Sequence, residues 1–153
     1  MFVLFPYYDS APCPYEATRI LDFYICFPVL ISEFKPPRAL VKPYNALKRR
    51  YTPNSYQVTP KPSVLFNRMR GAQSVATSSL QSYGFLQSEA FRNGIVSRTQ
   101  KQMPDLIALA VETHRKDHAD LVDFLTELKA LSPYGPTGLR ARGELEEFRY
   151  DNV

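Results

Sequence analysis

The stretch SVLFNRMRGAQSVATSSLQSYGFLQSEAFRNGIVSRT, residues 63–99, decides the fold that the sequence predicts. Its first part carries apolar residues at steps of three and four, the spacing of one face of an α-helix: Leu65, Met69, Ala72, Ala76, Leu80 and Tyr83. Ser63 is a candidate N-cap, and Gly84 supplies a stop. We therefore expect a helix over residues 63–83.

The second part of this stretch has the pattern of a β-hairpin. Residues 85–91 and 95–99 are two β-prone runs joined through Asn93-Gly94, a dipeptide favoured in tight type I′ turns because both turn positions need positive φ. A helix followed directly by a hairpin is the order of a winged-helix unit, in which the hairpin is the wing. The sequence predicts an α+β, mostly helical fold: a winged-helix-like domain with a small β-hairpin wing.

Helical patterns also flank this stretch. Upstream, we expect a helix that begins after Pro14 and bends or ends at Pro28. The residues that follow Pro28 are nearly all apolar, so this helix should be buried at the centre of the core. Downstream, Pro104 can occupy a first helical turn. From there we expect one long helix or two short ones with a break near Lys116, running to about Leu131.

Proline divides the chain, because 10 of its 13 prolines precede residue 63. Residues 35–62 should therefore be extended, with one short helix around residues 44–51. A chain of 153 residues is long enough for one core. We expect a single winged-helix-like domain over residues 1–131, which includes an N-terminal arm, and a C-terminal tail over residues 132–153 that is mobile unless bound.

Charge is segregated along the sequence. Residues 35–101 hold 12 Lys and Arg residues and one acidic residue, whereas both ends carry net negative charge. Such a basic middle suits a polyanion or an acidic partner, because the potential of clustered charges adds; a solvated basic face is the alternative. The segment 71–84 carries no charge, so direct base reading from this helix is poorly supported. The candidate contacts with nucleic acid or an acidic partner are Lys48, Arg49, Arg50, Arg68, Arg70, Arg92, Arg98 and Lys101.

Sequence motifs of enzyme chemistry are missing. The chain has no GxxxxGK[ST], GxGxxG, HExxH or GxSxG motif. His114 and His118 are four residues apart, a spacing that fits a surface pair on a helix better than a metal site. Cys13 and Cys26 fit small buried apolar residues better than nucleophiles. We expect no enzyme: no catalytic residue, no cofactor and no bound metal.

Two features bear on location. No stretch approaches the roughly 20 uncharged apolar residues of a membrane span. The first residues also lack the basic segment and clean apolar segment of a secretory signal. We therefore expect a cytoplasmic protein without a membrane partner.

Two strings of this sequence and the NG hairpin resemble the middle components of ABC-three-component systems, the group that includes the middle subunit of Lamassu anti-phage defence. The strings are RILDFYICFP, residues 19–28, and, after a proline-rich basic linker, FNRMRGAQSVATSSLQSYGFLQ, residues 66–87. The resemblance covers roughly residues 15–130, and the C-terminal tail has no matching motif.

The resemblance implies a small winged-helix-like adaptor between an SMC-like ABC ATPase and an effector, often a nuclease, in a prokaryotic anti-phage or anti-plasmid defence complex. Such a subunit has no activity of its own; it helps to hold the effector inactive and transmits the sensing of foreign double-stranded DNA. The missing catalytic motifs, the aromatic-rich first helix and the segregated charge agree with it. A winged-helix DNA-binding transcription regulator is the alternative, motivated by the basic middle. A third reading, an enzyme of unrecognised type, rests on no residue that we can name.

Overall fold

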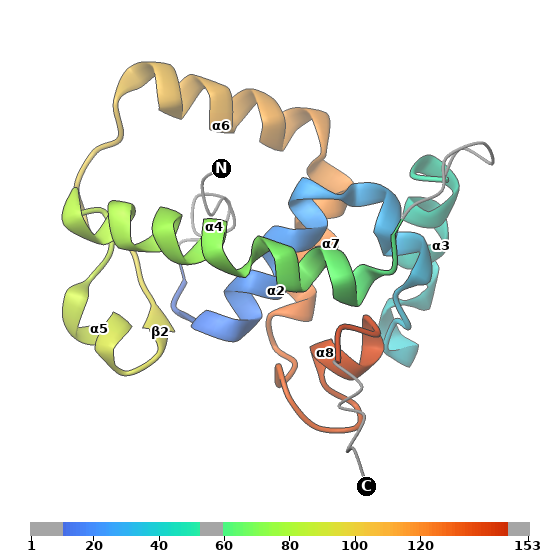
Figure 1. The fold of residues 1–153 in the computed structure, drawn as a ribbon. Helices are drawn as coiled ribbons and strands as arrows, with labels where there is room; N and C mark the ends of the chain where they lie inside the picture. Colours follow the sequence, from blue (N-terminus) through green and yellow to red (C-terminus); the bar gives the residue numbers. More distant parts are fainter. Residues whose placement is uncertain (1–10, 53–59, 147–153) are drawn as a thin grey trace, which may run out of the picture.

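The computed structural model describes residues 11–52 and 60–146, and these residues are mostly helical (Figure 1). Helices and strands follow in the order β1 (Cys13–Pro14), α2 (Tyr15–Cys26), η1 (Pro28–Glu33), η2 (Arg38–Leu40), α3 (Val41–Arg50), α4 (Pro62–Ser82), α5 (Ser88–Arg92), β2 (Ile95–Val96), α6 (Asp105–Asp117), α7 (Ala119–Leu128) and α8 (Leu139–Arg142). The η elements are short 3₁₀ helices.

Helix α2 forms the centre of the core. It begins directly after Pro14 and ends before Pro28, as the sequence predicts, and every residue from Ala17 to Ile25 is buried. The Phe23 ring lies 5.6 Å from the ring of Phe66 in α4. Leucine and phenylalanine side chains of α7 complete this core. The expectation of a buried central helix is confirmed.

Helix α4 crosses in front of α2 (Figure 1). Pro62 occupies its first turn, where the missing N–H costs no hydrogen bond. The predicted N-cap, Ser63, is wrong: the N-cap position is Lys61, and no side chain caps the helix. Gly84 follows the helix with a φ of 75°, so the predicted stop is confirmed.

Residues 85–99 depart from the predicted hairpin. The prediction of a tight turn is wrong, because Ser88–Arg92 form α5. Asn93 has a φ of −89°, whereas a type I′ turn needs a positive φ at this position. Pairing occurs further from the turn, where the Thr99 N–H donates to the Phe85 carbonyl oxygen at 3.0 Å. Strand β2 instead pairs antiparallel with β1, which places Val96 opposite Cys13. A small antiparallel sheet is present, but its two strands come from segments far apart in the sequence.

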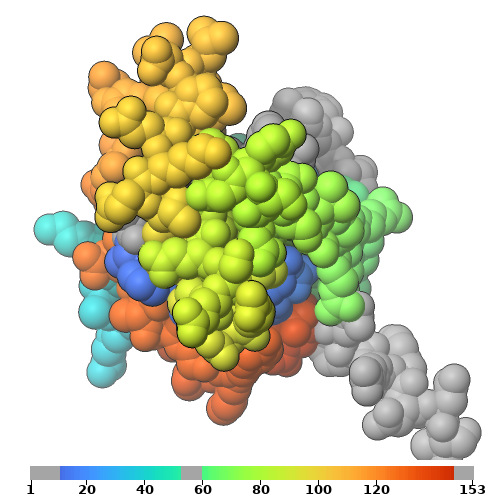
Figure 2. All heavy atoms as spheres, turned by 90° about the vertical axis from the view of Figure 1, so that its left-hand side faces the viewer, coloured from blue at the N-terminus to red at the C-terminus, as the bar shows by residue number. Residues whose placement is uncertain are grey.

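The remaining helices largely follow the prediction. Helix α3 lies in the proline-rich linker, close to the expected residues 44–51. The expected break near Lys116 is a junction at His118, which ends α6 and precedes α7. Helix α6 stands at the edge of the molecule above α4, as both views show (Figures 1 and 2).

The packed domain continues beyond the expected boundary at residue 131. Leu139 and Leu145 have no exposed surface and belong to the main core. The Lys35 N–H donates to the Arg142 carbonyl oxygen at 2.9 Å, and the Arg142 side chain donates back to the Lys35 carbonyl at 3.0 Å. Two isolated leucines between turn residues match no regular period, so the sequence pattern hid this packing. The rest of the predicted tail and most of the N-terminal arm lie outside the described residues.

Candidate docking surface

The first two turns of α6 are apolar on nearly all sides. The run LIALAV occupies residues 106–111, yet no side chain of α6 is buried. Leu106 is 84% exposed and Leu109 is 64% exposed. Within the part of the chain that the structure describes, this apolar helix is uncovered, which makes it a candidate interaction surface. Among the described residues, no helix combines the length and the apolar character that crossing a membrane requires.

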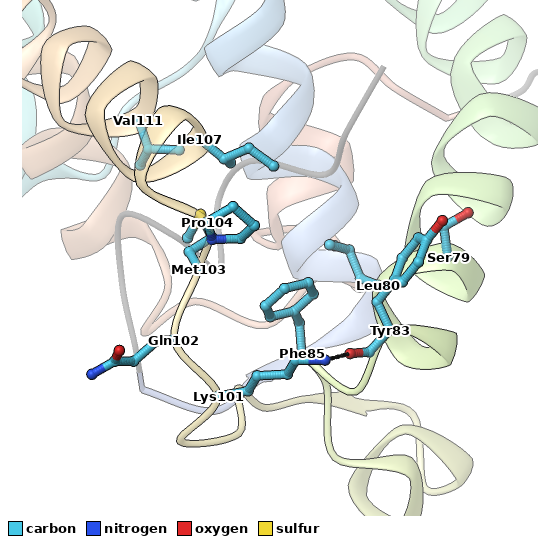
Figure 3. A pocket seen from close by; sticks show the side chains of 10 residues that line it. All are labelled: Ser79, Leu80, Tyr83, Phe85, Lys101, Gln102, Met103, Pro104, Ile107 and Val111. Carbon is cyan, nitrogen blue, oxygen red and sulfur yellow. Dashed lines mark hydrogen bonds between the residues drawn. The ribbon is translucent and has the colours of Figure 1, made fainter.

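A cavity of about 460 Å³ lies between α6 and the C-terminal end of α4 (Figure 3). Its lining is mainly apolar, and Gln102 points away from it in the close view. The Lys101 ammonium donates to the Tyr83 carbonyl oxygen at 2.6 Å and lies 5.1 Å from the centroid of the Phe85 ring. The apolar stem of this lysine therefore lines the cavity while its charge is held at one end. The lining residues are Ser79, Leu80, Tyr83, Phe85, Lys101, Gln102, Met103, Pro104, Ile107 and Val111.

Seven of the eight predicted basic contact residues are exposed, and five of these, on α3, α4 and α5, do not form one compact patch. Lys48 and Arg49 lie in the last turn of α3, Arg68 and Arg70 on α4, and Arg92 at the end of α5. Helices α3 and α5 lie at opposite ends of α4 (Figure 1). A 21-residue helix is roughly 30 Å long. A polyanion that touches all five must therefore extend along the whole of α4.

The other three predicted contact residues already have roles within the chain. Arg50 forms an ion pair with Asp120 of α7 at 2.5 Å and donates to the Asp117 carbonyl oxygen. The hydrogen bond that Arg50 donates to the Asp120 carboxylate raises the pKa of Arg50. Arg98 is half-buried beside the strand pairing described above, and the Lys101 ammonium is bound to a backbone carbonyl. Arg50 therefore ties α3 to α7, and its side chain already has partners within the chain.

Two histidines and a tyrosine meet where α6 joins α7. The Tyr51 hydroxyl lies 2.7 Å from Nδ1 of His118, and the two rings stack with centroids 5.9 Å apart. The ring of His114 lies 4.4 Å from that of His118. Burial, followed by the neighbouring His118, lowers the pKa of His114. No cluster of three or more His, Cys, Asp or Glu side chains in residues 11–52 and 60–146 is placed to hold a metal ion.

A buried polar network joins α2, α4 and α8. Gln73 of α4 accepts a hydrogen bond from Nε of Arg19 at 3.1 Å and donates to the Asp22 carboxylate at 3.1 Å. Glu16 pairs with Arg19 at 2.7 Å and with Arg140 at 3.5 Å. Both guanidinium groups also lie over the ring of Phe66, at 4.6 and 5.7 Å. The charged residues of the string RILD are therefore buried, and the second string supplies their amide partner.

Cys13 and Cys26 are not joined by a disulfide bond. Cys13 is buried, as expected, while Cys26 is half-buried. Burial and the nearby Asp22 raise the pKa of Cys26 to about 12. A thiol with so high a pKa carries little nucleophilic thiolate near neutral pH.

Sequence reasoning missed the surface of α6 and the partners in the buried network. The sequence did carry a signal for the exposed surface of α6. A half-buried helix needs apolar residues on one face only, whereas six consecutive apolar residues place them on every face. The buried network gave no such signal. Gln73 lies among polar positions of α4, and Arg140 lies 121 positions beyond Arg19.

A comparison with protein families gives one result. The family model described as ABC-three component (ABC-3C) system Middle Component 5 matches residues 1–151. No curated protein and no solved structure gives a significant match. The matched range includes both sequence strings and the segment that carries α8, so the resemblance to ABC-three-component middle components is confirmed. The chain belongs to the family of ABC-three-component system Middle Component 5 proteins.

Proposed function

We propose that this chain is a non-catalytic adaptor subunit that bridges an SMC-like ABC ATPase and a nuclease effector in an anti-phage or anti-plasmid defence complex, as in Lamassu systems. Family membership makes it a component of a multi-subunit ABC-ATPase system. One observation carries the adaptor role. Helix α6 exposes an apolar run that the described residues, 11–52 and 60–146, leave uncovered.

The energetics of α6 favour a stable partner. Burying a leucine side chain contributes about 1.5–3 kcal/mol, and Leu106 and Leu109 are both largely exposed. Apolar anchors next to a preformed cavity have the arrangement of an interface centre, where a few buried residues supply most of the binding energy. The α6 surface therefore has the chemistry of a subunit contact.

A bridging subunit needs a second surface of different chemistry. The exposed basic residues of α3, α4 and α5 supply it, since Lys48, Arg49, Arg68, Arg70 and Arg92 all face solvent. An acidic partner surface, or the backbone of double-stranded DNA held by the complex, would complement these cations. The two surfaces together suit a subunit that contacts two different partners.

A winged-helix DNA-binding regulator is the second candidate, favoured by the same exposed cations. It predicts a steep loss of DNA affinity between about 50 and 200 mM salt. Lys48→Glu with Arg49→Glu tests it, because both residues are exposed. Arg50 is left intact, since its replacement would break the ion pair with Asp120. Unchanged DNA retention in this double variant would count against phosphate contact at α3.

The test of the adaptor role is recovery of partners by the tagged full chain from its native host, after nuclease treatment and a high-salt wash. We expect mass spectrometry to find an ABC ATPase and a second subunit in fixed ratio. Leu106→Asp combined with Leu109→Asp should abolish this recovery, because each places a charge on the apolar surface. Arg115→Ala, an exposed polar position of the same helix, is the matched control.

Two results would contradict the proposal. A chain that elutes alone after nuclease and salt would leave the regulator as the better account. Undiminished recovery with the double aspartate variant would remove α6 from the subunit contact. Circular dichroism of each variant establishes that a loss of partners is not a loss of folding.

A further inference from the structure

We propose that the cavity between α4 and α6 binds an amphipathic carboxylate, a small molecule with an apolar chain and one negative charge, such as a medium-chain fatty acid. This inference does not rest on the adaptor role, because it concerns the isolated chain. Three observations carry it: the size of the cavity, its apolar lining, and the ammonium group that is held at one end of it (Figure 3).

The cavity has the size of a site for a small molecule. Its volume of about 460 Å³ lies within the roughly 300–1,000 Å³ of sites that enclose drug-sized ligands. Leu80 of α4 and Phe85, which follows α4, line one side, and Ile107 and Val111 of α6 line the other. A ligand in this cavity therefore contacts both segments, and the part of it that they enclose must be apolar.

The lining offers little to a ligand with many polar groups. Its polar side chains, among the described residues, are Ser79, Tyr83, Lys101 and Gln102. The Ser79 hydroxyl donates to the Val75 carbonyl oxygen at 2.9 Å, and Gln102 points away from the cavity (Figure 3). A ligand rich in hydroxyl or amide groups would lose hydrogen bonds to water there without equivalent replacements. The lining therefore favours a ligand with one polar end and an apolar remainder.

The charge of that polar end follows from Lys101, the one charged residue in the described lining. Its backbone N–H donates to the Thr99 hydroxyl at 3.3 Å, and this hydroxyl donates to the Gly84 carbonyl oxygen at 2.6 Å. Its ammonium donates to the Tyr83 carbonyl oxygen at 2.6 Å. An ammonium has three N–H donors, so this bond leaves donors for a ligand oxygen. A carboxylate is the complementary group, because hydrogen bonds between ionised partners are roughly twice as strong as neutral ones.

Isothermal titration calorimetry of the purified full-length chain with decanoate tests the inference. We expect one decanoate per chain. Decanol, which has the same apolar chain without the charge, and decyltrimethylammonium, which has the opposite charge, should bind at least about tenfold more weakly.

The contribution of Lys101 is tested with Lys101→Met, which keeps an apolar side chain of similar length but removes the charge. It should weaken decanoate binding about tenfold, because the charged hydrogen bond is lost, and leave decanol binding unchanged. A merely structural role for Lys101 would instead change both affinities alike.

Two substitutions on α6 form a matched pair. Ile107→Asp places a negative charge in the lining and should abolish decanoate binding, whereas Leu109→Asp lies on the same helix outside the lining and should preserve it. Circular dichroism establishes that both variants are folded. Hydrogen–deuterium exchange gives a second measurement: because the ligand contacts α6, decanoate should slow exchange over residues 105–117 in the parent protein.

Five results would overturn the inference. These are no saturable binding of decanoate, equal affinities for decanoate and decanol, binding that Lys101→Met leaves unchanged, binding that Ile107→Asp leaves unchanged, and exchange of α6 that decanoate does not slow. No decanoate binding, together with partner recovery that Ile107→Asp abolishes, would assign the cavity to a segment of a partner protein instead.

The outcomes for the two proposals are separable. Decanoate binding is measured on the isolated chain, whereas partner recovery depends on Leu106 and Leu109, which lie outside the cavity lining. A chain that recovers its partners but does not bind decanoate would overturn only the carboxylate site.

Discussion

Gln73 illustrates how one residue links the two strings that characterise this sequence. It is 2% exposed, and its amide contacts both Arg19 and Asp22. It also donates to the Arg19 backbone carbonyl at 3.0 Å. These charged residues serve the fold, because they hold α2 against α4 inside the core.

Replacing Gln73 with leucine keeps the approximate size of the side chain but removes these hydrogen bonds. Buried polar groups that lose their partners cost free energy, so we expect Gln73→Leu to lower the free energy of unfolding by about 3 kcal/mol. Ser74→Ala, at the exposed neighbouring position, should change it by less than about 0.5 kcal/mol. Urea unfolding measures both, and equal stability of the two variants would contradict a structural role for the network.

Two glycines provide a paired test of the packing of residues 132–146. A Cβ at Gly143 would collide with the hydroxyl oxygen of Tyr24 and lie 3.1 Å from Cγ of Leu145. Because Tyr24 is buried in the core, we expect Gly143→Ala to destabilise the protein by about 1–3 kcal/mol.

The opposite change in stability is expected for a substitution at Gly71. This glycine lies within α4, and an alanine methyl group there would have no atom within 4 Å. Because glycine loses more conformational entropy in a helix than alanine, Gly71→Ala should stabilise the protein by about 0.5–1 kcal/mol. Thermal unfolding of the two variants should shift the midpoint in opposite directions. A neutral Gly143→Ala would mean that residues 132–146 do not pack on Tyr24.

His114 should make stability depend on pH. Its pKa lies below the ordinary value of 6.5 in the folded protein, chiefly through burial and then through His118, against an opposing effect of Asp117. The unfolded chain therefore binds the proton more readily. The stability that depends on a neutral His114 is therefore fully present above about pH 6.5. It is lost as the pH falls below that value, because the unfolded chain then takes up the proton first.

The measurement is the urea midpoint at pH 7.5 and at pH 5.5. We expect the parent protein to lose more stability between these values than His114→Gln, which has no proton to gain. Equal losses in the two proteins would show that His114 does not contribute to acid sensitivity.

At the scale of elements, most helices could be predicted because their ends carry local signals. Pro14 and Pro28 bound α2, and Gly84 follows α4 with the positive φ that favours glycine. The prediction for residues 85–99 was wrong because the pairing of this segment depends on distant residues. Asn93-Gly94 favours a tight turn locally, but β1 pairs with β2, and Ser88–Arg92 form a helix instead of a strand.

The candidate sites show the same division between local and distant information. The basic residues could be found in the sequence, yet the partner of Arg50, Asp120, lies 70 positions further along. No spacing rule connects the two. The apolar run of α6 was visible as composition, but only the folded arrangement shows that these side chains stay uncovered. Sequence patterning therefore predicted the elements better than their surfaces.

For the whole molecule, the main feature is a division between a buried core and an exposed apolar helix. Helices α2, α4 and α7 with residues 132–146 form one core, whose leucines and phenylalanines are almost fully buried. Helix α6 contributes no buried residue. Because the other helices already form the core, the apolar side chains of α6 are free to be buried against another subunit, as the adaptor proposal requires.

The most direct test of the adaptor account is hydrogen–deuterium exchange of the chain alone and within its purified ABC-three-component complex. In the free chain we expect fast exchange over residues 105–117, because an uncovered helix opens readily. In the complex we expect strong protection of these residues, with α2 unchanged. Unaltered exchange of α6, with protection confined to other segments, would contradict the claim that α6 is the docking surface.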